Sequence, residues 1–195
     1  MRPKLMTSNE RKLKEFRRLG IDADIGGPAE DLIEPLAEPL FVCAHKAFTC
    51  GPGSLCEDTR LDVDGADIGI LARFLLEALP TLVGRRATFA CCLALAMENE
   101  VLVWEGRVEG VIVDSLGETG FGFDPFFAPD GGQGLRMGDL DALGRKDEFS
   151  ARARVCENYL GSKPVATFSF SELAKFKGPW QESEEAPAPP KSPSP

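Results

Sequence analysis

The chain has 195 residues, enough for about one domain, and 43% of them are apolar, so it can bury an ordinary hydrophobic core. Its 31 acidic residues outnumber its 22 basic ones, which gives a net charge of −9. A protein that binds nucleic acid through a general electrostatic surface carries the opposite sign, so this class of function is excluded.

The sequence predicts neither a membrane protein nor a secreted one. No apolar run approaches the roughly 18 residues that span a bilayer, and the first residues lack the apolar core of a secretory signal. The six cysteines contain no CxxC pair, which argues against zinc, and Cys91 and Cys92 lie in an apolar run, where thiols pack as small hydrophobic groups. We therefore expect a cytoplasmic protein with reduced thiols.

The first part of the chain predicts a short strand and several helices. A strand ending at Leu5–Met6 leads into a helix at about 10–19, which Gly20 ends as a C-cap. Apolar residues at helical spacing predict two further helices, at 37–48 and at 69–79.

Strands dominate the next part of the chain. A nearly unbroken apolar run at 87–96 is followed by strands at 101–104 and 108–113, which Glu105-Gly106-Arg107 separates. Connections this short predict an antiparallel meander. A last helix fits 147–160, so we expect an α/β fold in which helices flank a central mixed sheet.

The end of the chain is predicted to lie outside the fold. Residues 181–195 hold five of the 15 prolines and almost no apolar side chains. Proline cannot continue a helix or a central strand. We therefore expect one folded domain at 1–180 and a disordered proline-rich tail at 181–195.

The first candidate site is the turn from the first strand into the helix. Thr7, Ser8 and Asn9 precede the helix, whose free N–H groups favour an anion, and Lys12 lies one turn further on. Capping of the helix by Ser8 or Asn9 explains the same residues without any ligand. Taken alone, this motif favours capping.

The second candidate is the acidic run Glu57-Asp58-Thr59, with Glu34 upstream. Mg²⁺ takes one or two carboxylates together with phosphate oxygens, and one such acid could also deprotonate a water molecule. Neighbouring acids are common in a chain with 31 of them, so spacing alone is weak support.

The third candidate is Gly-Phe-Gly-Phe-Asp-Pro at 120–125, the most specific of the motifs. Four of the 13 phenylalanines fall within residues 120–127. A flat heteroaromatic base could stack on Phe121 or Phe123. The alternative is an aromatic core cluster at a turn, which we favour for Phe126 and Phe127.

The fourth candidate is the basic start of the last helix, Lys146 to Arg152. Cations near a helix N-terminus oppose its dipole, so helix stability gives no reason for them. Surface charge beside Asp147 and Glu148 is an equally good explanation.

In this order and with these gaps, the motifs resemble the inosine triphosphate pyrophosphatase family, whose members remove deaminated purine nucleotides. The resemblance runs from about Lys4 to Tyr159. It rests on Thr-Ser-Asn-x-x-Lys at 7–12, Glu34, Lys46, Glu57-Asp58-Thr59, the motif at 120–125, and Lys146 with Ser150-x-Arg152.

The resemblance implies a two-lobed α/β protein on a long central mixed sheet, with the nucleotide in the cleft between the lobes. It also implies a homodimer and a Mg²⁺ cofactor, with Mn²⁺ as an alternative. The reaction it implies is hydrolysis of ITP, dITP and XTP by attack of water on the α-phosphorus, which releases pyrophosphate and a nucleoside monophosphate.

The resemblance also implies the role of each motif residue. Asp58 is the catalytic base and, with Glu34, a metal ligand. The substrate-binding residues are Thr7, Ser8, Asn9, Lys12 and Lys46 at the triphosphate; Phe121, Phe123, Asp124, Lys146 and Arg152 around the base; and also Thr59, Arg73, Gly122 and Ser150.

The chain departs from the family pattern at the base-binding end. Members carry Ser-His-Arg in the last motif, where this chain has Ser150-Ala151-Arg152, and its one histidine, His45, lies elsewhere. Thr59-Arg60-Leu61 fits only the looser form of the acidic motif. We therefore expect the chemistry to survive with loosened base selectivity. The alternatives are a catalytically weakened nucleotide-binding relative and a relative that acts on modified pyrimidines.

Overall fold

The computed structural model describes residues 2–28, 32–66, 76–115 and 122–181, which form two compact units. The first unit holds the described residues up to Asp58, Cys91–Gly106 and those from Arg152 onward. The second unit holds the described residues of Thr59–Ala90 and Arg107–Ala151. Two units agree with the two-lobed fold that the resemblance implies.

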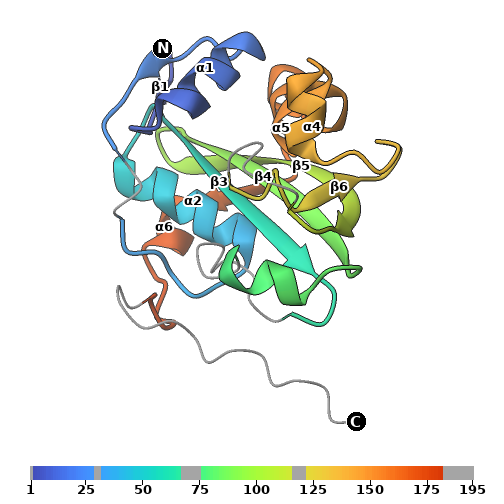
Figure 1. Ribbon diagram of the computed structural model, residues 1–195. Helices are drawn as coiled ribbons and strands as arrows, with labels where there is room; N and C mark the ends of the chain where they lie inside the picture. The colour runs from blue at the N-terminus through green and yellow to red at the C-terminus, as the bar shows by residue number, and fades with distance from the viewer. Residues whose placement is uncertain (1, 29–31, 67–75, 116–121, 182–195) are drawn as a thin grey trace. The chain divides into compact units, whose positions relative to one another are not determined.

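A mixed sheet of seven strands has the order β2-β1-β3-β4-β5-β6, and β7 pairs with β5 outside this path. β1 (Lys4–Leu5) is parallel to both β2 (Asp24–Ile25) and the first residues of β3 (Ser54–Val63). Figure 1 shows β3 as a long strand. β7 (Ala166–Ser169) runs antiparallel to the start of β5 (Glu100–Ile112). The combination confirms the predicted α/β fold with a mixed sheet.

Helix α1 (Glu10–Arg18) confirms the helix predicted at 10–19. Asn9 caps its start, because the Asn9 side chain accepts hydrogen bonds from the N–H groups of Arg11 and Lys12. Phe16 is its fully buried anchor. Gly20 follows the helix with a φ of +86°, a left-handed conformation that glycine adopts without steric cost.

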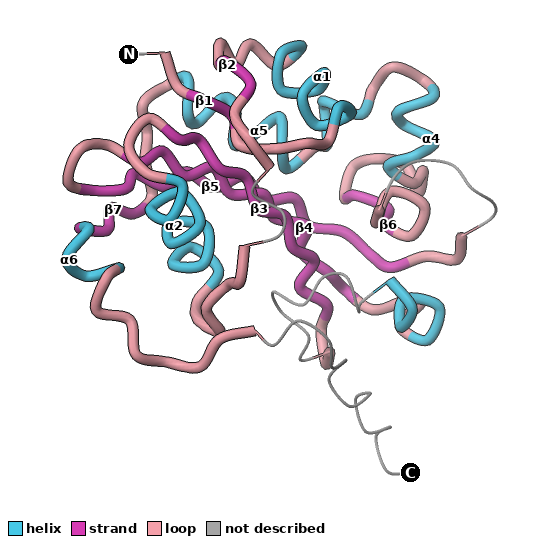
Figure 2. Tube along the Cα trace, turned by 90° about the vertical axis from the view of Figure 1, so that its left-hand side faces the viewer, coloured by secondary structure: helices cyan, strands magenta, loops and turns pink. Residues whose placement is uncertain are grey.

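Helix α2 (Pro39–Cys50) confirms the helix predicted at 37–48 and packs on the core of the first unit. Proline suits its first turn, where the missing N–H has no helical partner. α6 (Phe170–Leu173) contacts both α2 and β7, and Figure 2 shows the three side by side. The buried cluster that they share with the sheet consists of Cys43, Ala44, Ala47, Cys56, Cys92, Ala94, Ala96, Val101, Val103 and Leu173.

The second unit is built around the far end of β5. β6 (Phe127–Pro129) pairs antiparallel with Gly110–Ile112 of that strand, and Phe127 is fully buried. Two short helical segments, α4 (Met137–Ala142) and the 3₁₀ helix η2 (Lys146–Phe149), contact each other. A further 3₁₀ turn, η1, spans Leu79–Thr81.

The predicted meander is wrong at Glu105-Gly106-Arg107. β4 (Arg86–Ala96) matches the predicted strand at 87–96, but β5 is one unbroken strand of 13 residues. From Trp104 onward every second residue of β5 is buried, so the supposed turn residues continue the strand alternation. The three-residue link between β4 and β5 requires them to be antiparallel, because a parallel pair needs a long crossover.

The helix predicted at 147–160 is two segments. η2 ends at Phe149, Ser150 is extended with a ψ of 127°, and α5 begins afresh at Ala151 and ends at Leu160. The buried residues of α5 are Ala151, Val155 and Cys156, whereas Leu160 at its end is 56% exposed. The extended backbone at Ser150 therefore divides the predicted helix into two short segments.

Part of the prediction falls outside the described residues. Most of the helix predicted at 69–79 does so, although residues 76–78 are helical, and so does the predicted tail beyond Gln181. Among the residues that the structure describes, no helix is both long and apolar enough to cross a membrane. All six cysteines are free thiols, as expected.

Candidate active site

The turn between β1 and α1 holds the first group of predicted residues. The Asn9 Oδ1 atom accepts from the N–H groups of Arg11 at 3.0 Å and Lys12 at 3.3 Å, so Asn9 performs the capping that we had weighed against anion binding. Thr7 is buried, and its Oγ1 accepts from the N–H of Asn9 at 3.1 Å, while Ser8 is exposed. Capping does not exclude a ligand, so phosphate binding by this turn stays a prediction.

Glu57 lies at the centre of a buried ion-pair network. Its side chain is 3% exposed, and its Oε2 atom lies 2.6 Å from Lys12 Nζ. Its Oε1 atom lies 2.8 Å from an Arg152 nitrogen, and Arg152 also reaches Glu15 at 2.5 Å. The carboxylate of Glu57 raises the pKa of Lys12, so this ammonium is firmly protonated.

Lys46 forms a second buried ion-pair group. Its side chain is only 8% exposed, and its Nζ atom lies 2.5 Å from Glu34 Oε1 and 3.5 Å from Asp58 Oδ1. The two acids predicted to bind metal therefore converge on the ammonium of a residue predicted to bind phosphate. Neighbouring residues of a strand point to opposite faces, which explains why Glu57 and Asp58 have different cationic partners.

Asp58 has an unusually basic carboxylate. Burial raises its pKa, Lys46 opposes this, and the negative charges of Glu34 and Glu57 add to the rise, so that the pKa reaches about 6. A carboxylate with a pKa near neutrality is a better general base than an ordinary aspartate, because its basicity matches the working pH.

A small cavity of about 50 Å³ connects the two ion-pair groups. The structure thus brings together, within the first unit, four residues predicted to lie at the triphosphate or the metal: Thr7, Lys12, Lys46 and Asp58. It also adds Glu57, an acid of the second candidate run to which the family resemblance gave no role. The cavity is lined by Met6, Thr7, Lys12, Phe16, Lys46, Glu57 and Asp58.

The donor set suits a divalent cation that shares its coordination with a substrate. Glu34 and Asp58 supply two converging carboxylates, and Mg²⁺ commonly takes one or two of these with phosphate oxygens and water. Within the described part of the chain, no group of three or more His, Cys, Asp or Glu side chains could hold a metal by itself. The residues therefore fit a metal that completes its coordination with water or with phosphate oxygens.

The second unit holds a separate pair of predicted residues. Asp124 Oδ2 lies 2.7 Å from Lys146 Nζ, and the Asp124 side chain is 5% exposed. The Phe123 ring packs edge-on against Phe89, with ring centres 5.8 Å apart, and Phe127 packs edge-on against the same ring. This is the aromatic packing that we had proposed as the alternative for this motif, and base stacking stays a prediction.

The remaining predicted residues are spread between the two units. Ser150 is buried and Gly122 exposed, both in the second unit, and Thr59 is half-buried in β3. Arg152, which the resemblance implies lies beside the base, is ion-paired with Glu15 and Glu57 in the first unit. Phe121 and Arg73 lie outside the described residues.

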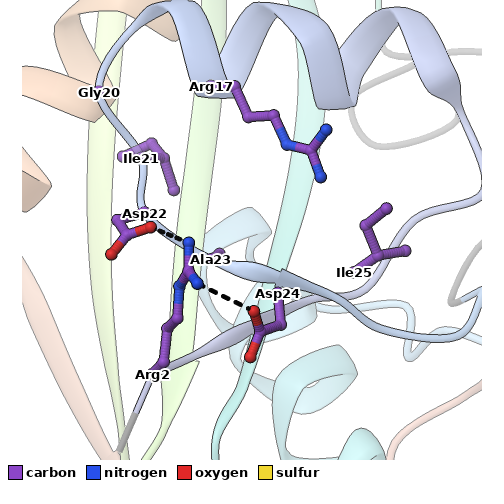
Figure 3. Close-up of a pocket in the computed structure, with 8 residues that line it drawn as sticks. All are labelled: Arg2, Arg17, Gly20, Ile21, Asp22, Ala23, Asp24 and Ile25. Carbon is purple, nitrogen blue, oxygen red and sulfur yellow. Dashed lines mark hydrogen bonds and ion pairs between the residues drawn. The ribbon is translucent and has the colours of Figure 1, made fainter.

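A second surface depression contains none of the predicted residues. It is lined by Arg2, Arg17 and residues 20–25. Figure 3 shows the Arg2 guanidinium between the carboxylates of Asp22 and Asp24, with which it forms ion pairs. Because these side chains are more than half exposed, the pairs stabilise the fold little, and we assign them no catalytic role.

Replacing Glu57 by glutamine tests the buried network. The change leaves Lys12 and Arg152 without the carboxylate between them, so we expect the free energy of unfolding to fall by about 3–5 kcal/mol. Asp130→Asn is the matched control, because the Asp130–Arg86 pair is exposed to solvent and should contribute little to the free energy of unfolding. Urea denaturation of both variants measures the difference. If both variants lost the same free energy of unfolding, the buried ion pairs of Glu57 would contribute no more to stability than an exposed pair.

Asp58 makes stability depend on pH in the metal-free protein. Its folded pKa of about 6 exceeds its usual value of 3.8, so between these values the folded state holds a proton that the unfolded chain has released. Stability should therefore fall as pH rises through this window, by roughly 2–3 kcal/mol. Urea denaturation with a chelator, comparing the protein with Asp58→Asn at each pH, isolates this contribution. If the free energies of unfolding of the two proteins changed in parallel from pH 4 to pH 7, this contribution of Asp58 would be contradicted.

Comparison with known proteins identifies the family. The sequence profile of the Ham1 family matches residues 4–160. A dITP/XTP pyrophosphatase from Leptospira biflexa is 32% identical over 141 residues, covering 62% of this chain and 70% of its own, and one from Korarchaeum cryptofilum is 29% identical over 167 residues, covering 77% and 89%. A HAM1 protein structure from Coxiella burnetii superimposes with a TM-score of 0.67 at 25% identity, over 83% of this chain and 98% of that one. These matches confirm the resemblance seen in the motifs, and the chain belongs to the Ham1 family.

Proposed function

We propose that the protein hydrolyses deaminated purine nucleoside triphosphates, namely ITP, dITP and XTP, to the monophosphate and pyrophosphate. The observation that carries the proposal is the convergence of Lys12, Lys46 and Asp58 on one cavity. By the family motifs, Lys12 and Lys46 bind phosphate and Asp58 is the catalytic base. Relatives that match much of this chain are named dITP/XTP pyrophosphatase.

The triphosphate end of the site works by charge and position. Lys12 and Lys46 are protonated, so they stabilise the negative charge that phosphate oxygens carry as the reaction proceeds. Asp58 accepts a proton from the water that attacks the α-phosphorus. The bond from that phosphorus to the bridging oxygen breaks, and pyrophosphate leaves with the electron pair.

Glu34 and Asp58 are the residues that hold the divalent cation, Mg²⁺ or Mn²⁺. When bound, the cation neutralises phosphate charge. The geometry of Glu34 and Asp58 supports this assignment, because both carboxylates lie within 3.5 Å of the same Lys46 Nζ atom and so converge on one point.

Base recognition falls to the Asp124–Lys146 pair and its neighbours. Lys146 offers an N–H donor suited to the 6-oxo group of hypoxanthine or xanthine, while adenine presents an amino group there and leaves the donor unpaired. Such a mismatch can discriminate by a factor of about 10⁴ or more. Ala151 removes the imidazole that family members carry in this motif, so we expect weaker discrimination. The family resemblance further supports a homodimer in the cytoplasm.

A pyrophosphate-release assay over a panel of triphosphates tests the function. We expect Mg²⁺-dependent release from ITP and XTP well above that from ATP and GTP, and a loss of about 10²–10⁴-fold in kcat for Asp58→Asn. Asp62→Asn is the control, since Asp62 lies on the same strand and pairs only with Arg60 among the contacts described. Circular dichroism verifies that both variants fold.

Three outcomes would contradict the proposal in different ways. Binding of ITP with no pyrophosphate formed would identify a nucleotide-binding relative without catalysis. Release from modified pyrimidine triphosphates alone would identify another substrate class. Full activity of Asp58→Asn would remove Asp58 from the mechanism.

A further inference from the structure

The folded chain continues well beyond the part that matches the family. The match ends at residue 160, yet β7 and α6 follow it, and the described structure reaches Gln181. β7 is built into the sheet by its antiparallel pairing with Glu100–Val103 of β5. Residues 161–181 are therefore a structural part of the first unit, for which the family match gives no role.

The last four of these residues, 178–181, lie along the segment that contains Glu34. The N–H of Leu36 donates to the carbonyl of Pro179 at 2.9 Å, and the N–H of Gln181 donates to the carbonyl of Glu34 at 2.8 Å. These bonds form an antiparallel bridge between Pro35 and Trp180. The backbone on both sides of Glu34 is thus hydrogen-bonded to the end of the described chain.

The side chain of Glu34 is held from the same direction. Gln181 Nε2 donates to Glu34 Oε2 at 3.3 Å, while Lys46 Nζ lies 2.5 Å from Oε1. Each carboxylate oxygen therefore has its own donor, one from residues 178–181 and one from α2. This is the arrangement by which outer residues orient a metal-binding carboxylate.

Trp180 anchors these residues to α2. Its ring packs edge-on against His45, with centres 5.1 Å apart, and against Phe176 at 5.5 Å. Phe176 in turn contacts Phe41, also on α2, at 5.2 Å. His45 directly precedes Lys46 in the sequence, so the ring contacts fix residues 178–181 to the helix that carries the other partner of Glu34.

We propose that residues 178–181 form a strap that positions Glu34 for metal binding, with Trp180 and Gln181 as positioning residues. The inference rests on the proposed function only in taking Glu34 as a metal carboxylate. Without the strap, Glu34 lies in a segment outside any regular helix or strand, and its carboxylate would have to be ordered when the metal binds. That ordering costs conformational entropy, which weakens metal affinity.

The test measures Mn²⁺ binding to the metal-free full-length protein in the absence of nucleotide. Electron paramagnetic resonance monitors the binding and gives the Kd. For Trp180→Ala and Gln181→Ala we expect the Mn²⁺ Kd to rise about 10-fold, within the range seen when outer partners of metal ligands are removed. Trp180→Phe keeps a ring against His45 and should restore affinity to within about twofold of the unmodified protein. Lys175→Ala, an exposed change just before the strap, is the control and should leave Kd unchanged.

Hydrogen exchange at the Leu36 amide provides a readout that does not depend on metal. We expect faster exchange in Trp180→Ala than in Lys175→Ala, because the Leu36 bond to Pro179 opens when the anchor is lost. Wild-type Kd and wild-type exchange in both strap variants would overturn the proposal, as would a protein that binds no Mn²⁺. A strap-dependent Kd in a protein that releases no pyrophosphate would refute the proposed function and leave the strap standing.

Discussion

The charges buried around β3 constrain the first unit more than any other feature. A buried charge that loses its partner costs several kcal/mol, so each carboxylate here requires a cation brought by another element. Glu57 takes Lys12 from α1 and Arg152 from α5, and Asp58 shares Lys46 of α2 with Glu34. Three helices are thereby tied to one strand by charge as well as by apolar packing. The same ion pairs hold cations and carboxylates around a small cavity. There a phosphate could take the place of a carboxylate beside a lysine, and a metal could take the place of a lysine beside a carboxylate.

The sequence predicted those elements whose local pattern decides their structure. α1 and α2 follow from helical spacing, and β4 follows from its apolar run. Glu105-Gly106-Arg107 has the composition of a turn, but sheet pairing overrides that local preference. The break at Ser150 was missed for a related reason, because the apolar residues on both sides of it fit one helical period by chance.

The candidate site was predictable in part. The motif order supplied Lys12, Lys46, Glu34 and Asp58 through the family resemblance, and the structure groups all four within one unit. The central position of Glu57 was not predictable, since its partner Arg152 lies 95 residues away. The strap was hidden for a similar reason, because Trp180 and Gln181 lie at the start of a proline-rich region with no pattern to suggest contact with Glu34. Long-range pairing of this kind leaves no local signal.

The central claim is that water attacks the α-phosphorus of a deaminated purine triphosphate held at the first unit's charged cavity. Hydrolysis of ITP in ¹⁸O-labelled water tests it most directly, with mass spectrometry of both products. The account predicts one ¹⁸O atom in the nucleoside monophosphate and unlabelled pyrophosphate. Label in pyrophosphate, or in inorganic phosphate released with a diphosphate, would contradict it.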